Sequence, residues 1–98
     1  MDFQDDQFEW DVDKSEGNRR KHGFDFFYAR RAFEDADYVE ALDDREDYGE
    51  ERLVAIGKVD DGLITVVYTP RGKRRRIISG WYSDDGERDD YFRPYYRQ

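Results

Sequence analysis

Three strand-like runs follow one another in the segment LVAIGKVDDGLITVVYTPRGKRRRIISGWY, which spans residues 53–82. The first two runs are rich in aliphatic and β-branched residues, and Asp60-Asp61-Gly62 between them is a hairpin turn signal. A second turn signal, Pro70-Arg71-Gly72, separates the second run from the third. Because both connections are short, we expect an antiparallel meander with strands at residues 53–57, 63–69 and 74–82.

Shorter elements flank this meander. Before it, Phe8-Glu9-Trp10-Asp11 alternates rings and acids as a short strand does, and Tyr38 to Leu42 is a candidate edge strand. After it, we expect a short helix that begins at Asp84 or Asp85 and covers Glu87 to Tyr96.

A polar helix is expected after the first short strand. Asp11 or Asp13 could cap it, and it would run through about Lys21. It would end at His22-Gly23, with the glycine in the left-handed conformation.

A second helix is expected at residues 26–35, after the good N-cap Asp25. Phe26, Ala29 and Phe33 give it one apolar stripe, which we expect to pack in the core. The order of elements predicts an α+β fold in one domain, residues 1–98 with frayed ends. Its helices would lie on one face of an antiparallel sheet.

Composition narrows the class of protein. With 98 residues the chain has room for one domain with a small core, and its 2 Trp, 8 Tyr and 7 Phe are too many for a disordered chain. It has no cysteine, which excludes disulfides, zinc-thiolate sites and thiol nucleophiles. No long apolar run follows the acidic start, so we expect a cytoplasmic protein with neither a signal peptide nor a transmembrane helix.

Charge is unevenly distributed along a chain whose net charge is −8. Residues 1–50 carry 7 basic and 17 acidic side chains, whereas residues 51–98 carry 10 and 8, and most of this basic surplus lies between Arg71 and Arg76. Asp supplies 17 of the 25 acids, and Lys supplies only 4 of the 17 bases. This bias leads to the hypothesis of a halophilic-type acidic surface, adapted to strong salt screening.

The basic run is the first candidate for chemistry. In a regular strand, one face would carry Arg74, Arg76, Ile78 and Gly80, and the other Arg75, Ile77, Ser79 and Trp81. Guanidinium groups bind phosphate through a planar, two-pronged fork of hydrogen bonds. The alternative is a hairpin tip kept soluble by charge, or a set of ion-pair partners for the many carboxylates.

Two further candidates lie outside the run. His22, the only histidine, could act as a general acid or base, or could bond the last carbonyls of its helix. Glu51 could act as a base beside Arg52 as a phosphate clamp, or the two could be an ordinary ion pair. The sequence has no metal-ligand spacing, nucleotide-binding glycine loop or serine nucleophile elbow. If the protein is an enzyme, we therefore expect chemistry on a phosphate-bearing substrate without a metal or cofactor.

Short motifs along most of the chain match a known family in their order and spacing. They are Phe8-Glu9-Trp10-Asp11, Lys14, Asn18, Lys21-His22-Gly23 and Phe26, then Asp44-Arg45, Gly49-Glu50-Glu51-Arg52 and Ile56-Gly57, then Leu63, Val66-Val67, Thr69, Arg71-Gly72, Arg76-Ile77-Ile78-Ser79, Glu87-Arg88 and Tyr91. From about Phe8 to Tyr91, the chain resembles the BrnT family, the toxins of a bacterial and archaeal type II toxin–antitoxin system.

The resemblance implies a RelE-like fold and a metal-independent ribonuclease that arrests growth. A BrnA-like antitoxin would neutralise it, and the complex would repress its own promoter, with the antitoxin alone reading the DNA. Positions of this chain that match the family pattern are Lys21, His22, Glu51, Arg52, Thr69, Arg71, Arg76, Ser79, Arg88 and Tyr91.

Within that pattern we expect a division of roles. Arg52, Arg76 and Arg88 would hold the scissile phosphate and stabilise its extra negative charge in the transition state. His22 or Glu51 would take the proton from the ribose 2′-hydroxyl that attacks the phosphate. The expected RNA-binding residues are Lys21, Arg71, Arg74, Ser79, Trp81 and Tyr91.

Two departures from the family pattern favour an alternative function. Glu46 stands where a histidine is common, and Gly80-Trp81 stands where Ala-Arg is common. Trp81 could stack on an RNA base, pack in the core or contact the antitoxin. The alternative is a catalytically weak or inactive member that binds the antitoxin and acts in promoter autoregulation. A third reading is a structural domain with only an ancestral link to the family.

Aromatic residues near the C-terminus are candidates for the antitoxin interface, because exposed rings often anchor interfaces. They are Tyr91, Phe92, Tyr95 and Tyr96. Equally, these rings could close the core under the last helix.

Overall fold

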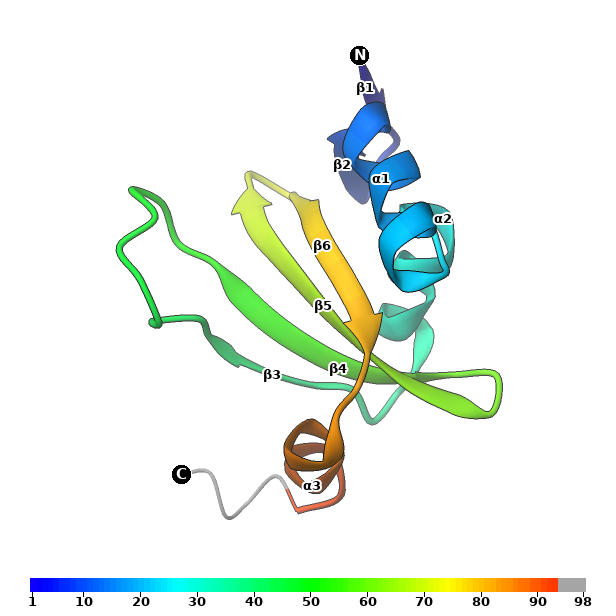
Figure 1. The fold of residues 1–98 in the computed structure, drawn as a ribbon. Coiled ribbons are helices and arrows are strands. Elements are labelled where there is room, and N and C mark those ends of the chain that lie inside the picture. The colour runs from blue at the N-terminus through cyan, green and yellow to red at the C-terminus, as the bar shows by residue number, and fades with distance from the viewer. Residues whose placement is uncertain (94–98) are drawn as a thin grey trace.

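An antiparallel meander forms the centre of the sheet in the computed structural model, which describes residues 1–93 (Figure 1). Its strands are β4 (Leu53–Val59), β5 (Gly62–Arg71) and β6 (Arg74–Tyr82). Each pairs with the next through a short turn, as predicted. The first strand is two residues longer than expected, because Lys58 and Val59 continue the pairing with β5 up to the turn.

Three short strands extend the meander on both sides, in the order β1-β2-β6-β5-β4-β3. The predicted edge strand β3 (Val39–Leu42) pairs antiparallel with β4, and the predicted strand β2 (Phe8–Asp11) pairs with β6. The β2–β6 pairing is parallel, so the prediction of a purely antiparallel sheet is wrong. Outside β2 lies β1 (Asp2–Gln4), a strand that the sequence did not predict.

Helix α1 (Val12–His22) follows the predicted start and stop signals. Asp11 accepts hydrogen bonds from the backbone N–H groups of Asp13 and Lys14, at 2.8 and 3.2 Å, and Gly23 ends the helix at φ 93°. Buried Asn18 fixes this polar helix, since its Nδ2 donates to the carbonyl of Phe24 at 2.9 Å. Its Oδ1 accepts from the Gly80 N–H at 3.1 Å. Asn18 thus satisfies a backbone N–H of β6 in the part of the strand with which β2 does not pair.

The second predicted helix has two parts with different geometry. It begins as α2 (Phe26–Ala29) after the predicted cap Asp25, and continues as a 3₁₀ helix, η1 (Arg30–Glu34). The prediction of one α-helix to residue 35 is therefore wrong. The fully buried positions, Phe26, Ala29 and Ala32, recur every three residues. That spacing fits the three residues per turn of a 3₁₀ helix.

One face of the sheet packs against α1, α2 and η1 through a core of rings. Trp10 is 1% exposed and stacks on Phe3, with ring centroids 4.4 Å apart, while Phe26 meets it edge-on at 6.0 Å. At Gly57 the backbones of β4 and η1 approach so closely that an added Cβ would lie 2.4 Å from the carbonyl oxygen of Ala32.

We expect the substitution Gly57→Ala to destabilise the protein by about 2–3 kcal/mol, because the backbone of η1 must move to admit the methyl group. Gly17→Ala is the matched control. Gly17 lies within α1 with nothing within 4 Å of its added Cβ, so the same change there should stabilise the fold by about 1 kcal/mol. Urea unfolding of both variants measures the difference. Equal effects at the two positions would contradict this close packing.

The last helix, α3 (Asp85–Phe92), begins as predicted, with Asp84 and Glu87 forming a capping box. It ends at Phe92 and not at Tyr96, since proline at position 94 disfavours helical geometry at Arg93. The prediction that all helices lie on one face is also wrong. Helix α3 lies beyond the end of β6, at the opposite end of the sheet from the β5–β6 turn (Figure 1).

Candidate functional site

A bulge in β6 determines which of its side chains share a face. Val67 of β5 lies opposite Ser79, and the next residue, Tyr68, lies opposite Ile77, so Ile78 is an extra residue. Arg76, Ser79 and Trp81 therefore share the face turned away from α1 and η1. The other face carries Arg75, Ile77 and Gly80. The grouping predicted from strict alternation is wrong beyond the bulge, because one inserted residue shifts every later side chain to the other face.

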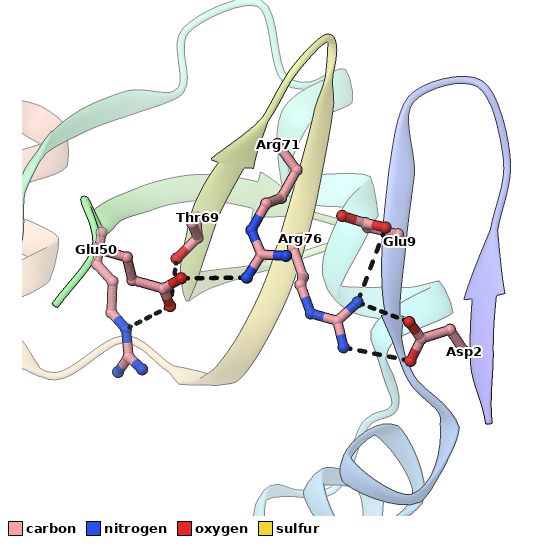
Figure 2. A network of polar contacts seen from close by, with 7 residues as sticks. Asp2, Glu9, Glu50, Thr69, Arg71 and Arg76 are labelled. Carbon is pink, nitrogen blue, oxygen red and sulfur yellow. Dashed lines mark hydrogen bonds and ion pairs between the residues drawn. The ribbon is translucent and has the colours of Figure 1, made fainter. Parts of the chain in front are cut away.

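Side chains of both charges form a row across the face that carries Arg76 (Figure 2). We call this set the charged row. Its members come from the end of the β3–β4 loop and from β5, β6, β2 and β1, and they are Arg52, Glu50, Arg71, Arg76, Glu9 and Asp2. Three guanidinium groups from separate stretches of the chain lie along this row, and each has a carboxylate partner. Arg52 and Arg76 were expected to hold the phosphate together with Arg88, which is not a member of the row.

Glu50 is the carboxylate at one end of the charged row. It accepts hydrogen bonds from Arg71 Nη2 at 3.1 Å and from Thr69 Oγ1 at 3.2 Å, and Arg52 Nε lies 3.6 Å away. Burial acts to raise the pKa of Glu50, but the hydrogen bonds from Arg71 and Thr69 outweigh it, so its pKa lies below the ordinary value. Glu50 is therefore ionised at neutral pH and can accept a proton.

Arg76 is the cation at the other end. Its two terminal nitrogens donate to the carboxylate of Asp2 at 3.1 and 3.3 Å, and Glu9 lies 3.8 Å from Nη1. The hydrogen bond from Arg76 lowers the pKa of Asp2, to which the charge of Arg71 also contributes. Arg71 and Arg76 therefore act on the same carboxylate. Arg71 keeps 48% of its side chain exposed, which leaves the row open to solvent there.

The loop between β3 and β4 holds Glu50 and Arg52 in place through a buried carboxylate. Asp43 is 1% exposed at its side chain and accepts hydrogen bonds from Arg45 Nε and Nη2, both at 2.8 Å, and from the Tyr48 hydroxyl at 3.2 Å. The Arg52 guanidinium lies 4.1 Å from the Tyr48 ring centroid. Asp43 thereby holds Tyr48 in place, and the Arg52 guanidinium packs over the ring of Tyr48.

The ion pair between the buried Asp43 and the exposed Arg45 predicts a pH dependence of folding. The hydrogen bond from Arg45 lowers the pKa of Asp43 from 3.8 to about 2 in the folded state. A depressed pKa stabilises the fold above pH 3.8, and this stabilisation, about 2 kcal/mol, is lost as the pH falls toward 2. Urea unfolding at a series of pH values between 2 and 3.8 measures how the free energy of unfolding changes with pH. We expect this change to be smaller in Asp43→Asn than in the parent. An unchanged slope would contradict this role of Asp43.

His22 and Trp81 lie together at the other end of β6. Their ring centroids are 6.3 Å apart, and the indole N–H of Trp81 donates to both Glu87 oxygens at 3.0 and 3.2 Å. Ser79 is half-buried between Trp81 and Arg76 on the same face. Trp81 is five positions after Arg76 along β6, which places it roughly 15 Å from this end of the charged row.

The remaining predicted site residues are not members of the charged row. Arg88 and Tyr91 line a cavity at the α3 end of the sheet, where the Tyr91 hydroxyl donates to Asp35 at 2.6 Å. Burial raises the pKa of Tyr91 to about 12. Arg74 Nε donates to the carbonyl of Asp5 at 2.7 Å, and Lys21 and Glu51 are exposed.

The carboxylates of the charged row were not among the predicted site residues. Alternation along the chain could have identified Glu50, because residues two apart share a face, and Glu50 is two residues before Arg52. No comparable signal exists for Asp2, which reaches Arg76 only through the β1–β2 hairpin and the parallel pairing with β6. The predicted interface residues Tyr95 and Tyr96 lie outside the described residues.

Residues 1–93 contain no group of three or more histidine, aspartate or glutamate side chains placed to hold a metal ion. Nor is any helix in this part of the chain long and apolar enough to cross a membrane.

Comparison with known families gives one match. A family model described as "Ribonuclease toxin, BrnT, of type II toxin-antitoxin system" matches residues 10–87, which include every strand of the meander and most of the charged row. Among curated proteins, none matches the chain.

Proposed function

Because the chain belongs to the BrnT family of ribonuclease toxins from type II toxin–antitoxin systems, we propose that it cleaves RNA on the charged row, without a metal ion. We also propose that a BrnA-like antitoxin neutralises it by covering that face. The observation that carries the proposal is that Arg52, Arg71 and Arg76 lie along one face of the sheet, where the ionised carboxylate of Glu50 contacts Arg52 and Arg71.

The arginines of the row would bind the scissile phosphate. A phosphate offers a guanidinium the same two-pronged acceptor that Asp2 now offers Arg76, at 3.1 and 3.3 Å. Displacing Asp2 would place the phosphate between Arg76 and the half-exposed Arg71. Both cations are then in position to stabilise the additional negative charge of the pentavalent transition state.

Glu50 would act as the general base, in the role that the sequence had suggested for His22 or Glu51. It is ionised and bonded to Arg71, so a phosphate on Arg71 brings the adjacent ribose 2′-hydroxyl close to its carboxylate. The 2′-oxygen gives its proton to Glu50 and bonds to phosphorus. The bond to the 5′-oxygen breaks, and this oxygen takes a proton from solvent. The products are a 2′,3′-cyclic phosphate and a 5′-hydroxyl.

Trp81 and His22 would bind a nucleotide further along the strand from the cleaved one. They lie on or beside the face of β6 that carries Arg76, and a half-buried indole offers a flat surface on which a base can stack. Glu87, which accepts a hydrogen bond from the indole N–H, holds the ring in one orientation.

A second candidate function has an observation in its favour. The three cations of the charged row are matched by three carboxylates, Glu50, Glu9 and Asp2, so the row carries no surplus positive charge to attract RNA. A family member with this neutral row could bind its antitoxin and act in promoter autoregulation without cutting RNA.

The test is incubation of the purified protein with RNA in the presence of EDTA. The proposal expects fragments ending in 2′,3′-cyclic phosphate, and expects RNA with a 2′-O-methyl group at the cut to stay intact. Cleavage that requires added magnesium would contradict the metal-free mechanism. Intact RNA together with unimpaired growth on induced expression would favour the antitoxin-binding function.

A further inference from the structure

A cavity with a surplus of cations lies on the face of the sheet opposite the charged row. A cavity of about 530 Å³ opens between the β1–β2 turn, η1 and the start of β6. Its charged lining consists of Arg30, Lys73 and Arg75 together with Asp5 and Glu34. Arg75 is the neighbour of Arg76 on β6 and points to the other face, so this cavity and the charged row lie back to back across one strand.

The sign of its charge distinguishes this cavity. Three cations and two carboxylates line it, whereas carboxylates outnumber cations in the linings of three other cavities formed by the described residues. In a chain with a net charge of −8, a cavity with surplus positive charge is unusual and favours an anion.

Arg75 forms no ion pair with a carboxylate of residues 1–93, although the charge of Glu40 acts on it from further away. Its guanidinium lies over three rings, with centroid distances of 4.4 Å to Phe33, 5.4 Å to Tyr68 and 6.0 Å to Tyr38. One terminal nitrogen donates to the Tyr38 hydroxyl at 3.0 Å, while the buried Nε has no hydrogen-bond partner. The rings hold the charge in place but neutralise it only in part.

The carboxylate of Asp5 is already committed. It accepts hydrogen bonds from the backbone N–H groups of Gln7 and Phe8, at 2.9 and 2.7 Å, and from Arg30 at 2.8 Å. Lys73 at the tip of the β5–β6 turn is exposed and has no ion pair within residues 1–93. An anion entering the cavity would therefore meet the charges of Arg75 and Lys73.

We propose that this cavity binds a phosphate of the RNA strand that flanks the cut, so that the strand bends around the β5–β6 turn. The inference rests on the proposed ribonuclease function. It follows from continuity, because Arg71 and Arg74 face each other across the turn and connect the charged row to Lys73. An acidic segment of a protein partner could bind the cavity alone, and its binding would not explain why cations continue from the cavity to the charged row.

The experiment measures the affinity of uncleavable 2′-O-methyl oligonucleotides, a tetranucleotide and a dodecanucleotide, across a range of salt concentrations. Lys73→Ala should weaken binding of the longer strand roughly five- to tenfold and reduce its salt slope by about 0.7, the value for one phosphate contact. Glu34→Gln should strengthen binding of the longer strand. The tetranucleotide, which fits on the charged row, should bind all these proteins equally, and Lys14→Ala serves as the exposed-lysine control.

The outcomes separate the two proposals. If neither strand binds the parent protein, the ribonuclease function fails and the cavity proposal falls with it. If both strands bind and Lys73→Ala changes neither, only the cavity proposal fails. If Lys73→Ala weakens binding of the antitoxin and leaves RNA unaffected, the cavity belongs to a protein partner and the proposal is overturned.

Discussion

Replacing Arg76 by alanine is expected to lower the rate of RNA cleavage by about 10³-fold and to abolish growth arrest. Arg76 presents both terminal nitrogens on the open face of the sheet, and no other side chain of the charged row offers a two-pronged fork at that place. Arg76→Lys keeps the charge but loses the fork, so we expect it to recover only part of the activity.

The matched control for Arg76 is Arg19→Ala. Arg19 is also an ion-paired arginine, with Glu16 as its partner, but it lies on the exposed side of α1 away from the row. Both variants should fold, as circular dichroism can establish, and only Arg76→Ala should lose cleavage. If Arg76→Ala remains fully toxic while folded, the assignment of the site to the charged row is wrong.

Glu50→Gln is expected to reduce cleavage by at least about 10²-fold, because glutamine cannot accept the proton of the 2′-hydroxyl. Glu51→Gln is a control of the same chemistry one residue away, and the exposed Glu51 side chain forms no ion pair with the row among the described residues. RNA affinity should not fall in Glu50→Gln, since the change removes a negative charge beside Arg71. If Glu50→Gln and Glu51→Gln lose the same amount of activity, Glu51 again becomes a candidate for the general base.

Much of the fold could be predicted because its signals are local. The turns at Asp60-Asp61-Gly62 and Pro70-Arg71-Gly72 fix antiparallel neighbours, and Asp11 and Gly23 mark the ends of α1 within the chain itself. The parallel pairing of β2 with β6 joins segments more than sixty residues apart. No turn signal exists for such a pair, so the sequence predicted the strand and missed its partner.

The candidate site was predictable in part for the same reason. Arg52, Arg71 and Arg76 lie on strands or strand ends whose pairing the turns determine, and the structure brings them together. Arg88 lies on α3, whose position depends on tertiary contacts such as Tyr91 with Asp35, and it lies at the other end of the sheet. The bulge at Ile78 has no sequence marker, yet it alone puts Trp81 on the face of Arg76.

The parallel pairing also bears on the order of events during synthesis. Phe8 and Glu9 cannot pair with Arg75 and Arg76 until the segment that contains these arginines has left the ribosome. Contacts of such high sequence separation form late in folding. An interrupted translation product that ends before β6 would lack both Arg76 and the strand with which β2 pairs. Under the proposed function, a nascent chain could therefore cleave RNA only after β6 has been synthesised.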